Sequence, residues 1–131
     1  MRWRFIAIGA LAVAGSCRDS TGPGSVTGTY ILRTADGIQV PVVLYSDDTE
    51  TDELVSGEVQ LNPDGTFRDI TAERITVNGE VQINAVEATG TYSLARDTVT
   101  FRMVNNGQYR MRVARDSLIQ DWFGIELVYT R

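Results

Sequence analysis

Apolar and polar residues alternate along most of this 131-residue chain, in runs that are separated by short turn sequences. Alternation places apolar side chains on one face of a β-strand, whereas a helix needs them three or four positions apart. Beyond residue 26 the alternating pattern prevails, and we predict no helix there. We expect nine strands, at about 28–34, 38–45, 53–61, 66–77, 80–94, 98–104, 108–114, 117–121 and 125–130.

The connections between these strands are short and rich in glycine, asparagine and aspartate. Asp36-Gly37, Asn78-Gly79 and the segments 62–65 and 105–107 have the composition of hairpin turns, because these residue types tolerate the positive φ of tight turns. Short turns make consecutive strands antiparallel neighbours. About eight or nine such strands close naturally, since closure removes exposed edges. The sequence therefore predicts an all-β, up-and-down antiparallel β-barrel, whose interior either is filled by side chains or holds one small ligand.

The alternation also assigns the residues of each strand to the two faces of the barrel wall. We expect the interior to be lined by Ile38, Val40, Val42, Leu44, Val55, Val59, Leu61, Val99, Phe101, Met103, Tyr109, Met111, Val113, Ile125, Leu127 and Tyr129. Within that interior, the candidate ligand-binding residues are Val40, Val42, Val59, Phe101, Met103, Tyr109 and Met111. Arg102, Arg110 and Arg112 alternate with the interior residues and are expected to face solvent.

The hairpin formed by 66–77 and 80–94 departs from this pattern, because both of its faces carry charged or polar residues. Either a bulge switches its faces or the hairpin extends past the rim of the barrel, and we expect a protruding, solvated ribbon. If Glu73 and Glu87 face inward instead, they are candidates for contact with a polar ligand or for carboxylate catalysis.

The composition excludes most nucleophilic chemistry, because the chain has no histidine and all 12 of its basic residues are arginine. Ser-His-Asp and Cys-His relays, imidazole metal sites and Schiff-base lysines are therefore excluded. Carboxylate chemistry and calcium binding remain. The acidic segment 47–53 lacks the alternating ligands and central glycine of a calcium loop, however, and we expect it to be a solvated connection. We expect no catalytic residue, no metal and no cofactor.

The N-terminal residues have the pattern of an export signal. Arg2 and Arg4 precede an apolar run, 5–14, that is too short to span a bilayer but long enough for the core of a secretory signal. Small residues then lead to Cys17, the only cysteine, in a segment that resembles the lipid-attachment box of bacterial lipoproteins. We expect a signal peptide at 1–16, a flexible tether at 17–26 that begins with an acylated Cys17, and a barrel domain at 27–131. The alternative is signal cleavage after Ala14, which leaves Cys17 as a free thiol.

Removal of residues 1–16 leaves ten of the 12 arginines against 17 acidic residues, a net charge of −7. Such a surface repels phosphate backbones and anionic lipid head groups. We therefore expect no nucleic-acid partner, and membrane contact only through the anchor on Cys17. In a bacterium with two membranes, Arg18 directly after Cys17 favours the outer membrane; the alternative is a soluble periplasmic or secreted protein. We expect a monomer.

Trp122 and Phe123 form an aromatic pair just before Gly124, in the last turn of the chain. We expect both to close one end of the barrel as part of its core. The alternative is that they gate the barrel mouth or contact a lipid surface.

Four short motifs carry a family resemblance. They are Gly-Thr-Tyr at 28–30, Asn-Pro-Asp-Gly-Thr-Phe at 62–67, a second Gly-Thr-Tyr at 90–92 and Val-Thr-Phe at 99–101. In this order along a meander, they resemble the small lipocalin-like lipoproteins of bacteria. The resemblance implies an up-and-down β-barrel, a hydrophobic ligand in some relatives, and no enzyme residues.

We therefore expect a non-catalytic, lipid-anchored protein of the cell envelope that binds a small hydrophobic ligand or an envelope partner. The alternatives are a carboxylate-dependent hydrolase acting on envelope saccharide and a purely structural, packed barrel.

Overall fold

The computed structural model describes residues 26–131, and every regular element in this part of the chain is a β-strand. The strands are β1 (Gly28–Ala35), β2 (Ile38–Gln39), β3 (Val42–Ser46), β4 (Glu50–Leu61), β5 (Thr66–Val77), β6 (Glu80–Ala95), β7 (Thr98–Met103), β8 (Gln108–Ala114), β9 (Ser117–Trp122) and β10 (Ile125–Thr130). The all-β prediction is confirmed. The predicted signal peptide, the acylated Cys17 and nearly all of the predicted tether lie outside the described residues. Between residues 26 and 131, no helix is long and apolar enough to cross a membrane.

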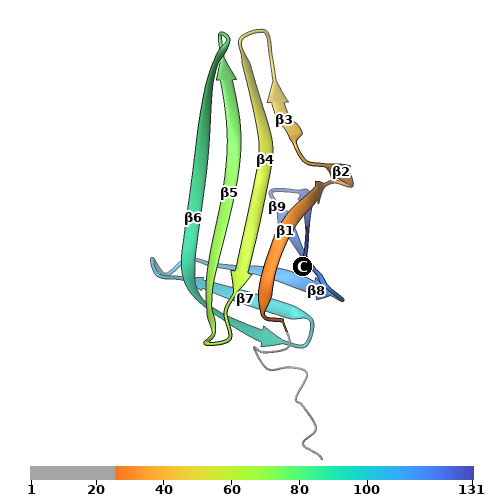
Figure 1. Ribbon diagram of the computed structural model, residues 1–131, viewed down its shortest axis with the longest axis vertical. Coiled ribbons are helices and arrows are strands. Elements are labelled where there is room, and N and C mark those ends of the chain that lie inside the picture. The colour runs from red at the N-terminus through yellow and green to blue at the C-terminus, as the bar shows by residue number, and fades with distance from the viewer. Residues whose placement is uncertain (1–25) are drawn as a thin grey trace, which may run out of the picture.

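Eight of these strands form a closed antiparallel barrel (Figure 1). Strands β4 to β10 follow one another round the wall, β10 pairs with β1, and the wall closes where β1 pairs with β4. In that closing pair Gly28 lies opposite Leu61, and Ile31 lies opposite Glu58. Each pair of neighbours is antiparallel, so the predicted up-and-down barrel is confirmed.

The predicted strand 38–45 is wrong, because the structure has two short strands there. β2 pairs with β1 and β3 pairs with β4, on either side of Pro41. Proline has no N–H to donate to a neighbouring strand, so a continuous ladder does not run through it. The two short strands therefore extend the sheet from β1 and from β4 separately, outside the eight-stranded wall (Figure 1).

The barrel encloses one hydrophobic core. Its fully buried side chains include Tyr30, Leu54, Val59, Leu61, Val99, Phe101, Met111, Leu118, Leu127 and Tyr129. Most of the predicted interior is confirmed, with two corrections. Ile38 is 60% exposed, because β2 lies outside the wall. A bulge between Leu54 and Ser56 shifts the register of β4 on β5, so Leu54 is fully buried in place of Val55.

The longest strands, β4, β5 and β6, extend well past the rest of the barrel (Figure 1). β6 pairs with β7 only from Gly90 onward, and its residues 80–89 pair with β5 alone. Residues 80–87 are all exposed, which confirms the predicted protruding ribbon for this half of the hairpin. Gly90 permits the close approach of β6 to β7, because a Cβ atom there would collide with the backbone carbonyl of Arg102.

Two of the predicted hairpin turns have the expected backbone conformation. The φ angles are 49° at Asp36 and 76° at Gly37, and 50° at Asn78 and 82° at Gly79. Positive φ at both central residues is the geometry that fits the twist of the flanking strands, so these turn predictions are confirmed.

Candidate functional site

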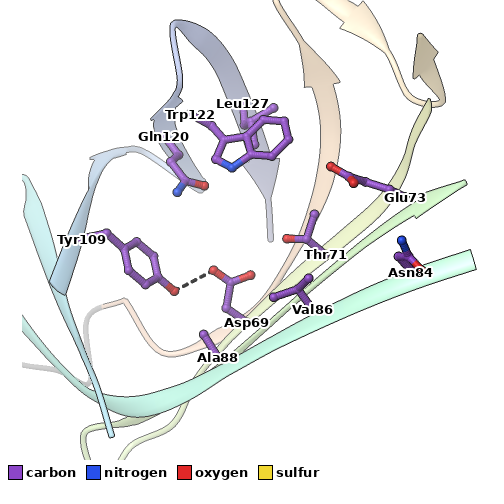
Figure 2. Close-up of a pocket in the computed structure, with 10 residues that line it drawn as sticks. All are labelled: Asp69, Thr71, Glu73, Asn84, Val86, Ala88, Tyr109, Gln120, Trp122 and Leu127. Carbon is purple, nitrogen blue, oxygen red and sulfur yellow. Dashed lines mark hydrogen bonds between the residues drawn. The ribbon is translucent and has the colours of Figure 1, made fainter. Parts of the chain in front are cut away.

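A pocket of about 230 Å³ opens at the end of the barrel where the long strands extend beyond it (Figure 2). Its lining comes from four sides of the barrel wall: β5, β6, β8, and the β9–β10 hairpin. The lining residues are Asp69, Thr71, Glu73, Asn84, Val86, Ala88, Tyr109, Gln120, Trp122 and Leu127. Asn84 and Val86 are exposed, so this side of the pocket is open to solvent.

The register of β5 on β6 explains one wall of the pocket. Asp69 lies opposite Ala88, Thr71 opposite Val86, and Glu73 opposite Asn84. Residues two apart on a strand share a face, and directly opposed residues share it too. These side chains therefore form two adjacent rows on the inner surface of the hairpin.

A buried carboxylate and a tyrosine form the base of the pocket. The Tyr109 hydroxyl donates a hydrogen bond to Oδ2 of Asp69 over 2.6 Å, and Asp69 is only 9% exposed (Figure 2). Burial raises the pKa of Asp69 above its usual range, and the hydrogen bond from Tyr109 partly opposes that rise. Burial also raises the pKa of Tyr109, and the neighbouring charge of Asp69 adds to that effect. Tyr109 is thus a neutral donor to Asp69 at physiological pH.

An aromatic cluster holds the Tyr109 ring in place. The ring is stacked on Phe101, with centroids 4.7 Å apart and planes inclined by 6°. Phe67 meets both rings edge-on, at 6.1 Å from Tyr109 and 4.9 Å from Phe101. Offset stacking and edge-to-face contacts are the favourable geometries for such rings. The aromatic core below the pocket therefore holds the Tyr109 hydroxyl in the position from which it donates to Asp69.

A second carboxylate, Glu73, lines the pocket, and Asp52 lies near it outside the lining. Because of the bulge in β4, Leu54 is opposite Glu73 and Asp52 is opposite Ile75, so Asp52 is on the same face as Glu73. Oδ1 of Asp52 is buried and has no hydrogen-bond partner. Burial, and after it the negative charge of Asp52, raises the pKa of Glu73. The side-chain amide of Asn84, directly opposite Glu73 on β6, also lines this side of the pocket.

The β9–β10 hairpin forms the opposite wall. Trp122 is half-buried and packs against the core, and its side chain extends over the same space as Asp69 and Glu73 (Figure 2). Phe123 is in the turn, where φ is 51°, and it is 92% exposed. The prediction that both aromatic residues close the barrel as core is therefore wrong for Phe123, because a turn residue with positive φ projects away from the sheet.

The predicted ligand-binding residues do not gather at this pocket. Only Tyr109 lines it. Val59, Phe101 and Met111 are fully buried in the packed core, whereas Val40, Val42 and Met103 are half-buried and pack against its edge. The sequence had one signal for the actual lining: the inward positions of 66–77 carry Asp69, Thr71 and Glu73, where a packed barrel would have apolar residues.

The basic side chains near the hairpin are on its outer surface. Arg68 pairs with Glu87, with Nε and Oε1 2.9 Å apart, and Arg74 pairs with Glu53, with Nε and Oε2 2.6 Å apart. Glu87 does not line the pocket, so Glu73 and Glu87 do not form a pair in one site. Arg102, Arg110 and Arg112 are exposed, as predicted. None of the ten lining residues is basic.

Asp47 organises the turn between β3 and β4. Its Oδ1 accepts backbone hydrogen bonds from Thr49 (2.8 Å) and Glu50 (2.7 Å), and Tyr45 donates its hydroxyl to Oδ2. These hydrogen bonds lower the pKa of Asp47 to about 2. Residues 47–49 are thus a solvated turn, as predicted, but the prediction of a solvated connection is wrong for 50–53, which are half-buried in β4 and paired with β5.

Comparisons with models of known protein families, with curated proteins and with solved structures each found no match.

Proposed function

We propose that the protein is a non-catalytic, lipid-anchored component of the cell envelope that binds a small, largely apolar molecule in the pocket between β5–β6 and β9–β10. The observation that carries the proposal is the pocket itself, at the mouth of an otherwise packed barrel. Its volume of about 230 Å³ is just under the usual range for ligand sites, about 300–1,000 Å³, which favours a small ligand. Half of the ten lining residues are apolar or aromatic and the other half are polar or charged, so the lining combines a carbon surface with groups that can orient a ligand.

The envelope location rests on the N-terminal sequence. An apolar run ends in small residues at Cys17, and a polar segment rich in Ser, Thr and Gly follows. Such a segment would let an anchored barrel stand away from the membrane. Labelling of cells with a fatty acid tests the anchor: the wild-type protein should carry label, and Cys17→Ser should not. Label missing from the wild type would place the protein in the soluble periplasm or outside the cell.

Ligand binding is tested by mass spectrometry of small molecules released from the purified protein. The matched variants are Ala88→Phe, which fills the pocket, and Ala85→Phe, which places the same ring on the exposed opposite face of β6. We expect a co-purifying compound with the wild type and with Ala85→Phe, and its loss from Ala88→Phe. A wild-type protein free of any bound compound, together with no binding from an apolar compound library, would contradict the proposal and favour a structural barrel.

A carboxylate-dependent hydrolase is the second candidate, because Asp69 and Glu73 line one pocket and both have a raised pKa. Raised pKa values are typical of general acids in glycoside hydrolysis. The test is turnover on a panel of envelope glycans, with loss of activity in Asp69→Asn and in Glu73→Gln. No turnover by the wild type would reject this candidate.

A further inference from the structure

We infer that the ligand of this pocket is a small organic cation, an alkyl- or arylammonium compound whose charged nitrogen is held between Asp69, Glu73 and Trp122. This inference rests on the proposed ligand-binding function and assigns the chemical class of the ligand. Three features of the described residues support it: the charge of the pocket, the acceptor sites of its two carboxylates, and the position of its aromatic and apolar side chains.

The first feature is charge. Asp69 and Glu73 line the pocket, Asp52 lies beside Glu73 on the same face, and no lining residue is basic. A neutral apolar ligand would remove water from Asp69 and Glu73 without replacing its hydrogen bonds, which costs free energy. An anion such as a fatty acid would add repulsion to that cost. A cation instead offsets the negative charge, and the attraction is stronger where water is excluded.

The second feature is the number of acceptor sites that the two carboxylates offer. An ionised carboxylate has about four acceptor sites, and Tyr109 supplies one donor to Asp69. Asp52 lies on the same face of the sheet as Glu73, and its buried Oδ1 has no hydrogen-bond partner. A primary ammonium group carries three donors and no acceptor. It can therefore donate to Asp69 and Glu73 at once, beside the neutral polar groups of Thr71, Asn84 and Gln120 that also line the pocket.

The third feature is the arrangement of the carbon surface. Trp122 and Leu127 lie across the pocket from Asp69 and Glu73, and Val86 and Ala88 form the wall beside them (Figure 2). A cation near an indole ring gains a further attraction to the ring face. Val86, Ala88 and Leu127 offer an apolar surface to the carbon part of the same molecule. The pocket thus fits a short cationic amphiphile, with its nitrogen toward the carboxylates and its chain along the apolar side chains.

The test uses three probes with the same carbon chain: hexylammonium, 1-hexanol and hexanoate. Binding is followed by Trp122 fluorescence in the full chain carrying Trp3→Phe, which leaves Trp122 as the only tryptophan, and by calorimetry. We expect hexylammonium to bind at least about tenfold more tightly than 1-hexanol, which corresponds to about 1.4 kcal/mol, and hexanoate to bind most weakly. Asp69→Asn and Glu73→Gln should each reduce the ratio of hexylammonium to hexanol affinity. Glu80→Gln, which removes the same charge at the exposed end of the hairpin, should leave it unchanged.

The outcomes separate this inference from the proposed function. If 1-hexanol or hexanoate binds as tightly as hexylammonium, the inference of a cation is overturned, and the proposal of a ligand-binding pocket stands. If none of the three probes binds by either measurement, the inference of a cation is overturned, and the co-purification and library tests above decide the proposed ligand binding. If hexylammonium is preferred but the ratio is unaffected by Asp69→Asn and Glu73→Gln, the preference comes from elsewhere on this acidic protein and the inference is overturned.

Discussion

Tyr109→Phe should destabilise the barrel at neutral pH by about 2 kcal/mol, because it leaves a buried carboxylate without its donor. The substitution keeps the ring, and with it the stack on Phe101 at 4.7 Å and the edge contact with Phe67. What it removes is the 2.6 Å hydrogen bond to Asp69, which is 9% exposed. Leaving a buried polar group without a hydrogen-bond partner lowers the free energy of unfolding by about 1–3 kcal/mol, and by more for a charged group. For a domain of this size, a cost of about 2 kcal/mol lowers the Tm by about 8 °C.

The assay is thermal unfolding followed by circular dichroism at pH 7 and at pH 3. The matched control is Tyr45→Phe, which makes the same change in a solvent-exposed pair, Tyr45 with Asp47, and should leave the Tm nearly unchanged. The loss in Tyr109→Phe should shrink at pH 3, where Asp69 is protonated in both the folded and the unfolded chain. A Tm equal to that of the wild type at pH 7 would refute the reasoning, because it would mean that Asp69 does not depend on Tyr109.

Three further substitutions test the site and the wall around it. Asp69→Asn should stabilise the protein at pH 7, because it removes a buried charge and its side-chain oxygen still accepts the hydrogen bond from Tyr109. The pKa of Asp69 is raised in the folded state, so the gain in the free energy of unfolding should fade as the pH falls toward about 3.9. Urea unfolding at a series of pH values measures this. Gly90→Ala should lower the free energy of urea unfolding by about 2 kcal/mol or more, because the new Cβ atom would collide with the backbone carbonyl of Arg102. An unfolding midpoint equal to that of the wild type would contradict this. Asp47→Ala should destabilise the β3–β4 turn at pH 7, because it removes the hydrogen bonds that the Asp47 carboxylate accepts. The pKa of Asp47 is lowered to about 2 in the folded state, so the difference in stability between the variant and the wild type should disappear as the pH falls through that value.

The regular parts of the fold could be predicted from the sequence because they depend on local patterns. Alternation within 108–114 and the turn residues on either side of 66–77 mark strands that the structure has with the same bounds. The turn at Asn78-Gly79 sets the register of the longest hairpin. Closure follows from the number of strands and the short turns between them.

The irregular parts could not be predicted, because single residues decide them. Pro41 separates two short strands that the apolar pattern joins. The bulge at Val55 reverses the two faces of β4, and no property of valine itself marks that place. Because β5 and β6 extend beyond the wall, their inward-facing polar residues line a pocket. From alternation alone, polar residues at these positions look like an interruption of the apolar core pattern.

Most of the predicted ligand-binding residues lie in a different layer of the barrel from the residues that line the pocket. Alternation finds residues that face inward, and most of these pack against one another, as Val59, Phe101 and Met111 do. A ligand pocket needs space, and space depends on which strands extend past their neighbours. Tyr109 belongs to both sets because its ring is in the aromatic cluster while its hydroxyl reaches Asp69 at the base of the pocket.

The most direct test of the pocket is a crystal structure of the full chain grown with hexylammonium. We expect electron density for one molecule, with its nitrogen within hydrogen-bond distance of the Asp69 or Glu73 carboxylate and its chain against Trp122 and Val86. A pocket filled by its own side chains, or a ligand bound with its nitrogen directed away from both carboxylates, would contradict the account.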